Sequence, residues 1–346
     1  MRPRPEVGVT RRRLLTTAAA MALGAGAERS VSPRQAEVRA APGTTSLKVI
    51  VFPGGFNWPI WVAQEQAFFA AQHLAVALTP TPSSVYQLTH LIAGDFDIAM
   101  TAMDNLIAYD EGQGEVPVEG RPDLFAFLGG DNGFLRLIVQ PGVRTYADLK
   151  GKTLSVDAPT TGYAFVLRKM LEVNGLGRGD YTLVPAGGVL QRWEALLRGE
   201  HAGTLLVTPF EILARSRGLT LLGSAIDTLH RYQGLVGAAR RSWAAAHRDE
   251  LVGFIRAYRN ALGWLYAPGN REEAIRLLAR NASMPTELAA QAYSIMVNPA
   301  GGFFPTGALD IEGIRTVMAL RSRYATPRKI LADPNKYLDS SFFPPA

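Results

Sequence analysis

Lys48-Val49-Ile50-Val51-Phe52 and Lys152-Thr153-Leu154-Ser155-Val156 are two short β-prone runs, 104 residues apart, and together they decide the fold. Each run ends at a predicted loop that contains a proline. A helical pattern follows each loop, over residues 60–72 in the first case and 164–174 in the second. The recurrence of strand, loop and helix at a near-constant spacing predicts an internal repeat.

The repeat continues beyond these helices. Predicted strands at 74–80 and 181–185 both end in proline, and a second predicted helix follows each of them. Those helices end in Leu91-Ile92-Ala93-Gly94-Asp95 and Leu196-Leu197-Arg198-Gly199-Glu200. Glycine is the residue that favours the left-handed turn at a helix C-terminus, so both segments predict helix ends.

Third strands at 98–100 and 204–207 complete the two halves, and each half therefore reads β-α-β-α-β. Strands that alternate with helices predict mostly parallel sheet with right-handed crossovers. We expect an α/β protein of two lobes, each a mostly parallel sheet flanked by helices. Ligands of such open sheets bind outside the carboxyl ends of the strands, so two facing lobes predict a ligand cleft between them.

The chain must cross between the lobes, and two extended apolar runs are candidates for the crossings. We predict hinge crossings at residues 135–138 and 234–238. These crossings assign residues 47–134 together with 239–346 to the first lobe, and residues 139–233 to the second.

Residues 1–41 are predicted to be an export signal followed by a linker. Thr10-Arg11-Arg12-Arg13-Leu14-Leu15 resembles a twin-arginine signal, and a modestly apolar run and the small residues Ala25-Gly26-Ala27 follow in the order that a signal peptidase needs. We therefore expect a periplasmic protein exported by the twin-arginine route, with a general secretory signal as the alternative.

Charge and composition exclude several classes of function. Of the 36 basic and 30 acidic residues, eight and three lie in residues 1–41, so the rest of the chain is about neutral and gives no argument for nucleic-acid binding. The absence of cysteine excludes disulfides, thiolate metal sites and cysteine nucleophiles. No stretch of 18 or more residues is apolar throughout. We expect a monomer that carries no cofactor and no metal.

Four segments resemble the NMT1/THI5-like family, the SsuA-like periplasmic solute-binding proteins of ABC importers for sulfonates, taurine, nitrate and thiamine-pyrimidine precursors. They are Trp61-Val62-Ala63-Gln64-Glu65-Gln66-Ala67-Phe68-Phe69, Leu91-Ile92-Ala93-Gly94-Asp95-Phe96-Asp97-Ile98-Ala99, Tyr146-Ala147-Asp148-Leu149-Lys150-Gly151-Lys152 and Val184-Pro185-Ala186-Gly187-Gly188. The resemblance runs from about residue 47 to about residue 326. It implies a type II-like periplasmic-binding-protein fold, capture of a small organic solute by hinge closure, and a membrane permease as partner.

The chain departs from this family at the predicted cleft edge, where Val207 and Thr208 replace a tryptophan and a glutamate that the family often has. No familiar ligand is therefore carried over. Two other functions stay open: a thiamine-pyrimidine-synthase-like enzyme of the same fold, and a ligand-sensing periplasmic protein. The absence of cysteine counts against the enzyme, since those relatives need a cysteine-rich motif.

The predicted ligand site lies in the loops that follow the strands. Its aromatic side chains offer flat apolar contacts, its glycines let the backbone approach a ligand, and free N–H groups at a helix start suit an acid group. The candidates are Phe56, Asn57, Trp58, Thr101, Asp104, Asn132, Thr160, Thr161, Gly162, Tyr163, Gly188, Thr208 and Phe210.

Some of these residues have a structural alternative. Asp104 and Thr161 suit helix caps, and Trp58 suits a packed core. Arg136 and Arg192 are the basic candidates near these loops, and either favours an anionic ligand. The combination points to a small sulfonate or an aromatic or heterocyclic acid.

Overall fold

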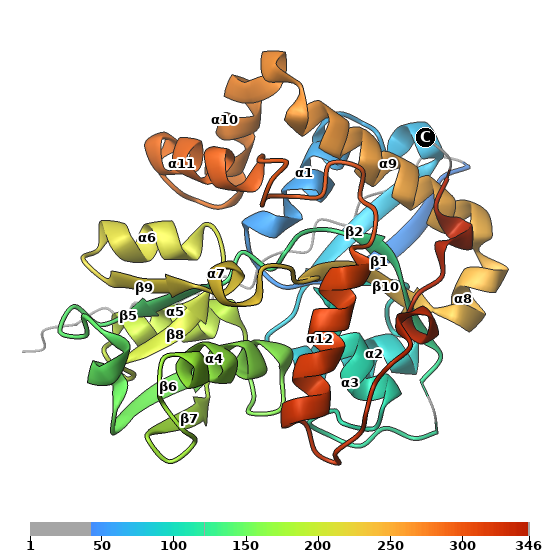
Figure 1. The fold of residues 1–346 in the computed structure, drawn as a ribbon. Coiled ribbons are helices and arrows are strands. Elements are labelled where there is room, and N and C mark those ends of the chain that lie inside the picture. The colour runs from blue at the N-terminus through green and yellow to red at the C-terminus, as the bar shows by residue number, and fades with distance from the viewer. Residues whose placement is uncertain (1–42, 121, 345–346) are drawn as a thin grey trace, which may run out of the picture. The chain divides into compact units, whose positions relative to one another are not determined.

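The computed structural model describes residues 43–120 and 122–344, so the predicted export signal lies outside the described residues. Within them the chain forms ten strands in two five-stranded sheets, which twelve α-helices flank (Figure 1). We call the first sheet with its helices lobe 1 and the second sheet with its helices lobe 2.

The sheet of lobe 1 has the strand order β2-β1-β3-β10-β4. Strand β1 pairs in parallel with β2 and β3, whereas β10 runs antiparallel between β3 and β4. The bounds are β1 Thr45–Val51, β2 Leu74–Pro80, β3 Ile98–Ala102, β4 Leu124–Gly129 and β10 Leu235–Arg240. Val49, Ile50 and Val51 of β1 are buried, as a central strand covered on both faces requires.

The sheet of lobe 2 repeats this arrangement in the order β7-β6-β8-β5-β9. Strand β6 pairs in parallel with β7 and β8, and β5 runs antiparallel between β8 and β9. The bounds are β5 Arg136–Val139, β6 Lys152–Val156, β7 Tyr181–Pro185, β8 Gly203–Leu206 and β9 Thr220–Ser224.

The predicted repeat is confirmed in both lobes. Its halves are β1-α1-β2-α2-β3 and β6-α4-β7-α5-β8, with helix bounds α1 Trp58–Glu65, α2 Ser84–Ala93, α4 Gly162–Val173 and α5 Val189–Leu197. Gly94 and Gly199 follow the ends of α2 and α5 with φ angles of 90° and 73°, the left-handed conformation that the sequence predicts for them.

The two predicted hinge crossings lie in strands. Most of 135–138 belongs to β5 and most of 234–238 to β10, the antiparallel strand of each sheet. A buried antiparallel strand has the same extended apolar pattern as a buried crossing, so the sequence does not separate them. The segments that pass between the sheets are 130–135, before β5, and 225–234, before β10. Bending of these segments stays a prediction.

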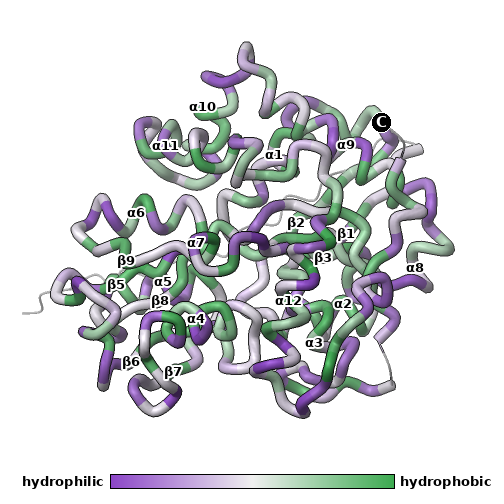
Figure 2. The backbone as a smooth tube through the Cα atoms, viewed as in Figure 1, coloured by the Kyte–Doolittle hydropathy of each residue, from purple (hydrophilic) through white to green (hydrophobic). Residues whose placement is uncertain are grey.

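The remaining helices are α3 Met103–Asp110, α6 Phe210–Ser216, α7 Ala225–Leu229, α8 Arg241–Ala246, α9 Arg248–Tyr266, α10 Arg271–Asn281, α11 Thr286–Met296 and α12 Ile311–Tyr324. Along covering helices such as α4 and α10, hydrophobic and hydrophilic stretches alternate (Figure 2). Each of these helices buries one face. Helix α9 packs on α1, but α12 contacts both α3 of lobe 1 and α4 of lobe 2. The C-terminal part of the chain therefore contacts lobe 2 as well as lobe 1.

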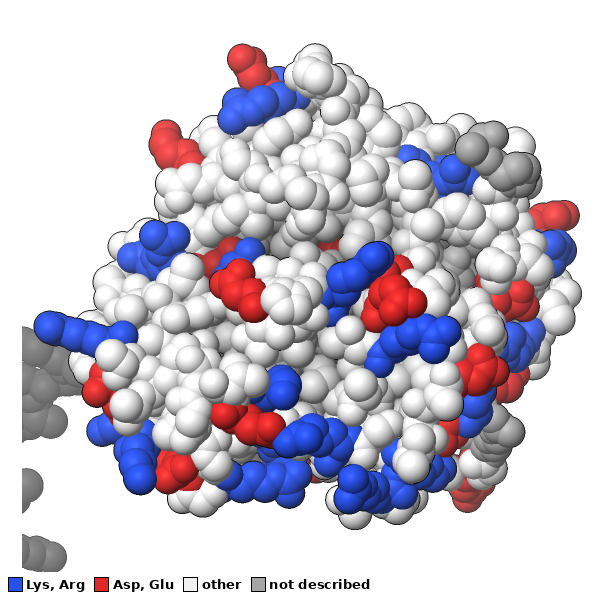
Figure 3. Space-filling model, in the orientation of Figure 1, with Lys and Arg blue, Asp and Glu red and all other residues white. Residues whose placement is uncertain are grey.

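Surface charge agrees with the near-neutral composition of the chain after residue 41. Both signs of charge are scattered over the face shown in Figure 3. No helix among the described residues is long and apolar enough to cross a bilayer.

Candidate functional site

A cavity lies between the two lobes, beside the segments that cross from one sheet to the other. Its volume is about 50 Å³, and it opens partly to solvent. Its walls come from lobe 1, from the first crossing and from lobe 2. They consist of Phe52, Phe56, Ala102, Asn105, Asp131, Gly133, Phe134, Leu235, Asp157, Thr161, Gly162, Tyr163, Val189, Arg192 and Val207.

Most of these residues follow the carboxyl end of a parallel strand. Phe52 follows β1, Asp157 follows β6 and Val207 follows β8. Ala102 ends β3, and Val189 begins the helix that follows β7. The fold thus builds the cavity where open α/β sheets place their ligands.

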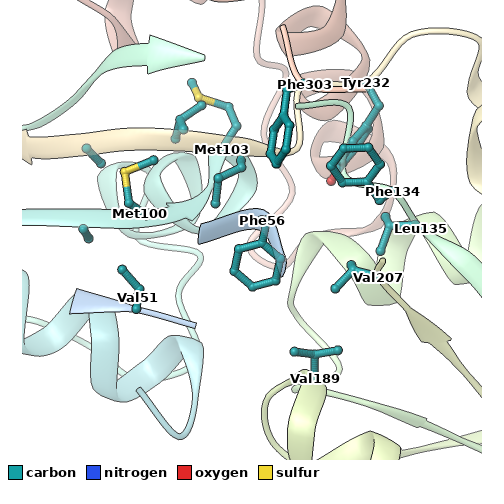
Figure 4. Close-up of a cluster of buried hydrophobic side chains, with 14 of the residues drawn as sticks. Val51, Phe56, Met100, Met103, Phe134, Leu135, Val189, Val207, Tyr232 and Phe303 are labelled. Atoms are coloured by element: carbon teal, nitrogen blue, oxygen red, sulfur yellow. The ribbon is translucent and has the colours of Figure 1, made fainter. Parts of the chain in front are cut away.

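The walls are largely apolar. Figure 4 shows Phe56 from lobe 1 directed towards Val189 and Val207 of lobe 2, with Phe134 of the first crossing beside them. All four side chains are at most 8% exposed. A flat apolar group fits such walls, and a few polar side chains are left to fix its orientation.

Arg192 is the buried cation of the cavity. It lies in the first turn of α5, is 3% exposed, and donates to the carbonyl oxygens of Gly187 at 2.8 Å and Leu205 at 3.3 Å. Burial lowers the pKa of its guanidinium, and the nearby carboxylate of Asp157 opposes that effect. Carbonyl oxygens hold the side chain in place without neutralising its charge.

Asp131 is the buried acid of the cavity. Its Oδ1 accepts the backbone N–H groups of Gly133 at 2.7 Å and of Leu235 at 3.2 Å. Its own carbonyl oxygen accepts the N–H of Gly234 at 2.9 Å. Burial raises the pKa of the carboxyl to about 6. Asp131 therefore fastens the first crossing to the end of the second.

Direct hydrogen bonds join the lobes at the cavity rim. The N–H of Ser84 in lobe 1 donates to Asp157 Oδ2 in lobe 2 at 3.3 Å. The N–H of Gly188 in lobe 2 donates to the carbonyl oxygen of Pro82 in lobe 1 at 3.1 Å. The lobes therefore touch each other beside the cavity.

Four of the sequence-predicted residues line the cavity: Phe56, Thr161, Gly162 and Tyr163. Thr161 occupies the N-cap position of α4, but its hydroxyl donates to the carbonyl oxygen of Ala158 at 2.8 Å and leaves the cap without a side-chain bond. Burial raises the pKa of Tyr163.

The first-lobe candidates other than Phe56 lie outside the cavity lining. Asn57 donates to the carbonyl oxygen of Phe52 at 2.7 Å, and Trp58 is fully buried with its ring edge against Tyr293. Thr101 is fully buried and accepts a hydrogen bond from Asn105 at 3.1 Å. These three side chains hold the loops in place.

Asp104 and Thr160 also have protein partners. Asp104 is 1% exposed and pairs with Arg321 of α12 at 2.6 Å. It lies so close to Gly162 that a Cβ there would come within 2.3 Å of the Asp104 side chain. Thr160 donates its hydroxyl to Glu115. The start of α4, which the sequence predicts to bind an acid group of the ligand, therefore faces the carboxylate of Asp104.

The remaining candidates likewise lie outside the lining. Asn132 donates to the carbonyl oxygen of Gly301 at 3.1 Å, and Thr208 donates to Glu211 at 2.5 Å. Gly188 bonds Pro82 across the lobes, and Phe210 packs its ring near Trp193. Arg136 donates to the carbonyl oxygen of Leu135 at 3.3 Å and does not line the cavity.

Several lining residues were not among the predicted ones. Phe52 and Asp157 each stand directly after the strand that opens a half of the repeat, which is a signal the sequence contains. Asp131 and Phe134 lie in the first crossing, one and two residues from the predicted Asn132, and they line the cavity whereas Asn132 does not. Among the described residues, no group of three or more His, Asp or Glu side chains is placed to hold a metal ion.

Comparison with known proteins gives a family match. The family model described as NMT1/THI5 like matches residues 57–274. No curated protein sequence matches the chain.

Solved structures with the same fold are numerous. A protein from Bordetella bronchiseptica RB50 is 18% identical with a TM-score of 0.72, over 87% of this chain and 96% of that one. The zinc-bound ligand-binding component of an ABC-type import system from Staphylococcus aureus is 13% identical with a TM-score of 0.69, over 87% and 98%. The alkanesulfonate-binding protein SsuA from Xanthomonas axonopodis pv. citri, bound to MOPS, is 17% identical with a TM-score of 0.66, over 82% and 93%. These likenesses confirm the predicted two-lobed α/β fold.

Proposed function

The chain belongs to the NMT1/THI5-like family, and on that premise we propose that it captures a small organic solute between its lobes and delivers it to a membrane importer. The observation that carries the proposal is the cavity, to which both lobes and the first crossing contribute side chains. A solute in such a cavity contacts both lobes at once.

Capture works by closure. Two lobes joined by two crossing segments open and close about them, and a ligand that contacts both lobes favours the closed state by its differential affinity. The hydrogen bonds from Ser84 to Asp157 and from Gly188 to Pro82 form only when the lobes meet, so they stabilise the closed state. The proposed role is binding without chemistry, and the largely apolar walls support it.

The partner and the compartment belong to the same proposal. The structural neighbours include a ligand-binding component of an ABC-type import system and an alkanesulfonate-binding protein. By analogy with them, we place this chain in the periplasm, with a membrane permease as partner and a sulfonate or an aromatic or heterocyclic acid as solute.

The test is a thermal-shift screen of the protein over sulfonates, carboxylates, amines and pyrimidines, followed by calorimetry and X-ray scattering on the hits. A true ligand raises the free energy of unfolding by RT ln(1 + [L]/Kd), and the melting temperature rises with it. It also lowers the radius of gyration as the lobes close. Failure of a broad metabolite panel to shift the melting temperature contradicts solute capture.

An uptake assay distinguishes a role in import from a role in sensing. Deletion of the gene abolishes accumulation of the labelled ligand if the protein feeds an importer. Normal uptake together with a lost transcriptional response to the ligand contradicts the transport role and supports sensing.

A further inference from the structure

The two buried charges of the cavity define the class of solute. We infer that the ligand is dipolar, with a flat apolar skeleton, an anionic group held by Arg192 and a cationic or N–H donor group held by Asp131. This inference rests on the proposed solute-binding function and goes beyond it, because it requires two opposite functional groups on one molecule.

Arg192 holds the anionic group of the ligand. Two of its five N–H groups donate to backbone carbonyl oxygens, at 2.8 and 3.3 Å. Within the described part of the chain this guanidinium forms no ion pair with a carboxylate, although the side chain is only 3% exposed. Asp157, which lines the same cavity, acts on this charge from beyond ion-pair distance and accepts the N–H of Ser84 through Oδ2. A buried cation without a paired anion is costly, and an anionic ligand group removes that cost.

Asp131 accepts a hydrogen bond from the cationic or N–H group of the ligand. Both backbone N–H groups that it accepts are bonded to Oδ1, so among the described residues no group donates to Oδ2. The side chain is 2% exposed, and Asp131 lines the cavity. No lysine or arginine in residues 43–120 or 122–344 pairs with it. A ligand ammonium or N–H group is the partner that such a carboxylate lacks.

The two charges lie on different elements that line the same cavity. Asp131 lies in the crossing after β4, whereas Arg192 lies on α5 of lobe 2, and they form no ion pair with each other. Burial raises the pKa of the Tyr163 phenol, and both charges act on it as well, since Asp131 raises this pKa further and Arg192 lowers it. Phe56, Phe134 and Val207 supply the apolar surface of the cavity (Figure 4). One molecule that meets all three regions carries opposite groups on an apolar skeleton.

The residue that binds the ligand's donor group also lies at the hinge. Asp131 bonds Gly133 in the first crossing, and Gly234 and Leu235 at the end of the second. A ligand group on Oδ2 therefore binds the residue that fastens the crossings together, while the group at Arg192 binds lobe 2. Recognition of both groups is coupled to the position of the lobes.

The test compares matched probes by calorimetry. The two dipolar probes are 4-(aminomethyl)benzoate and 4-(aminomethyl)benzenesulfonate. Their single-group counterparts are 4-methylbenzoate, 4-methylbenzenesulfonate and 4-methylbenzylamine. We expect a dipolar probe to bind about tenfold or more tighter than either single-group counterpart, because a hydrogen bond to a charged group has about that effect.

Variants assign each group to its residue. Asp131→Asn keeps an oxygen that accepts the Gly133 and Leu235 N–H groups, and we expect it to weaken the dipolar probe about tenfold while leaving the single acid unchanged. Arg192→Met weakens every acid probe and leaves the single amine unchanged. Glu211→Gln and Arg136→Met are the matched controls, since they change a buried acid and a lobe 2 arginine outside the lining, and both keep the parent affinity.

The outcomes separate this inference from the proposed function. Single-group acids that bind as tightly as the dipolar probes, or an Asp131→Asn protein with unchanged affinity for them, overturn the dipolar class and leave solute capture intact. If Asp131→Asn fails to fold, the probe comparison on the parent protein still decides. No binding by these probes or by the broad panel overturns both.

Discussion

Arg321 donates through Nη1 to Asp104 Oδ2 at 2.6 Å, and both side chains are essentially inaccessible to solvent. Arg321 lies on α12, and Asp104 lies in the first turn of α3 in lobe 1. The same guanidinium reaches the carbonyl oxygen of Thr160, just before α4 of lobe 2, at 3.5 Å. One buried cation therefore connects the C-terminal helix to both lobes.

Removal of this cation should be costly. Arg321→Met leaves the Asp104 carboxylate buried without its partner, and such losses reduce the free energy of unfolding by about 3–5 kcal/mol. Urea denaturation followed by circular dichroism measures the change. The double variant Asp104→Leu with Arg321→Met buries no lone charge and should recover part of the loss. Equal losses in the single and double variants would show that packing, not charge, is responsible. Arg198→Ala breaks an exposed pair with Glu200 and should have little effect.

Gly162 tests the close contact between the lobes. Gly162→Ala places a methyl group within 2.3 Å of Asp104, so we expect weaker ligand binding and a lower melting temperature. Gly263→Ala is the matched control, because Gly263 lies on the exposed side of α9 with open space around it. That change should stabilise the protein by about 0.5–1 kcal/mol. An unchanged ligand affinity in Gly162→Ala contradicts a close lobe contact at this position.

Glu211 should make stability depend on pH. Burial raises its pKa to about 7, from 4.5 in an unfolded chain, while the Thr208 hydroxyl opposes this shift. The unfolded chain therefore loses the proton first, and the free energy of unfolding falls as pH rises from 4.5 to about 7, by about 3 kcal/mol from this group.

Glu211→Gln should flatten this slope, because its amide does not titrate. Thermal unfolding at half-unit steps between pH 4 and 8 measures it. The exposed Glu287→Gln variant should keep the parent slope. A Glu211→Gln protein with the parent slope shows that Glu211 titrates normally in the folded state.

Val207 controls the size of the cavity. Val207→Trp restores the residue that the family often has at this position, and the indole fills space between Val189 and Phe56. We expect loss of binding to a ligand found with the parent protein, and calorimetry measures it. Phe210→Ala lies three residues away and outside the lining, so it should leave affinity nearly unchanged. The reverse pattern would place the site on the other side of the Thr208-Pro209 turn.

The order of elements was readable from the sequence because it depends on periodicity. The strands 74–80 and 181–185 match β2 and β7 residue for residue, since runs of β-prone residues that end in proline have few alternatives. The antiparallel strands β5 and β10 were predicted as crossings instead. Pairing partners far apart in the chain leave no local signal, so the sequence does not show them.

The site was less readable because it depends on where each side chain points. Phe56 and Trp58 are two residues apart, yet only Phe56 lines the cavity, and Trp58 is buried in the core. Val207 and Thr208 are adjacent, and again only one of them lines it. The sequence predicts Asn132 as a site residue, whereas its neighbour Asp131 lines the cavity. Composition identifies such loops, but backbone direction selects the residue within them.

The interleaved strand order constrains how the chain folds as it is made. The sheet of lobe 2 is built from one continuous stretch, residues 136–224, whereas β10 lies between β3 and β4 of lobe 1 and is synthesised more than a hundred residues after both. Until residue 240 has emerged from the ribosome, β3 and β4 lack the strand that joins them. Lobe 2 is therefore expected to acquire structure first during translation, and lobe 1 is completed around a strand that arrives late.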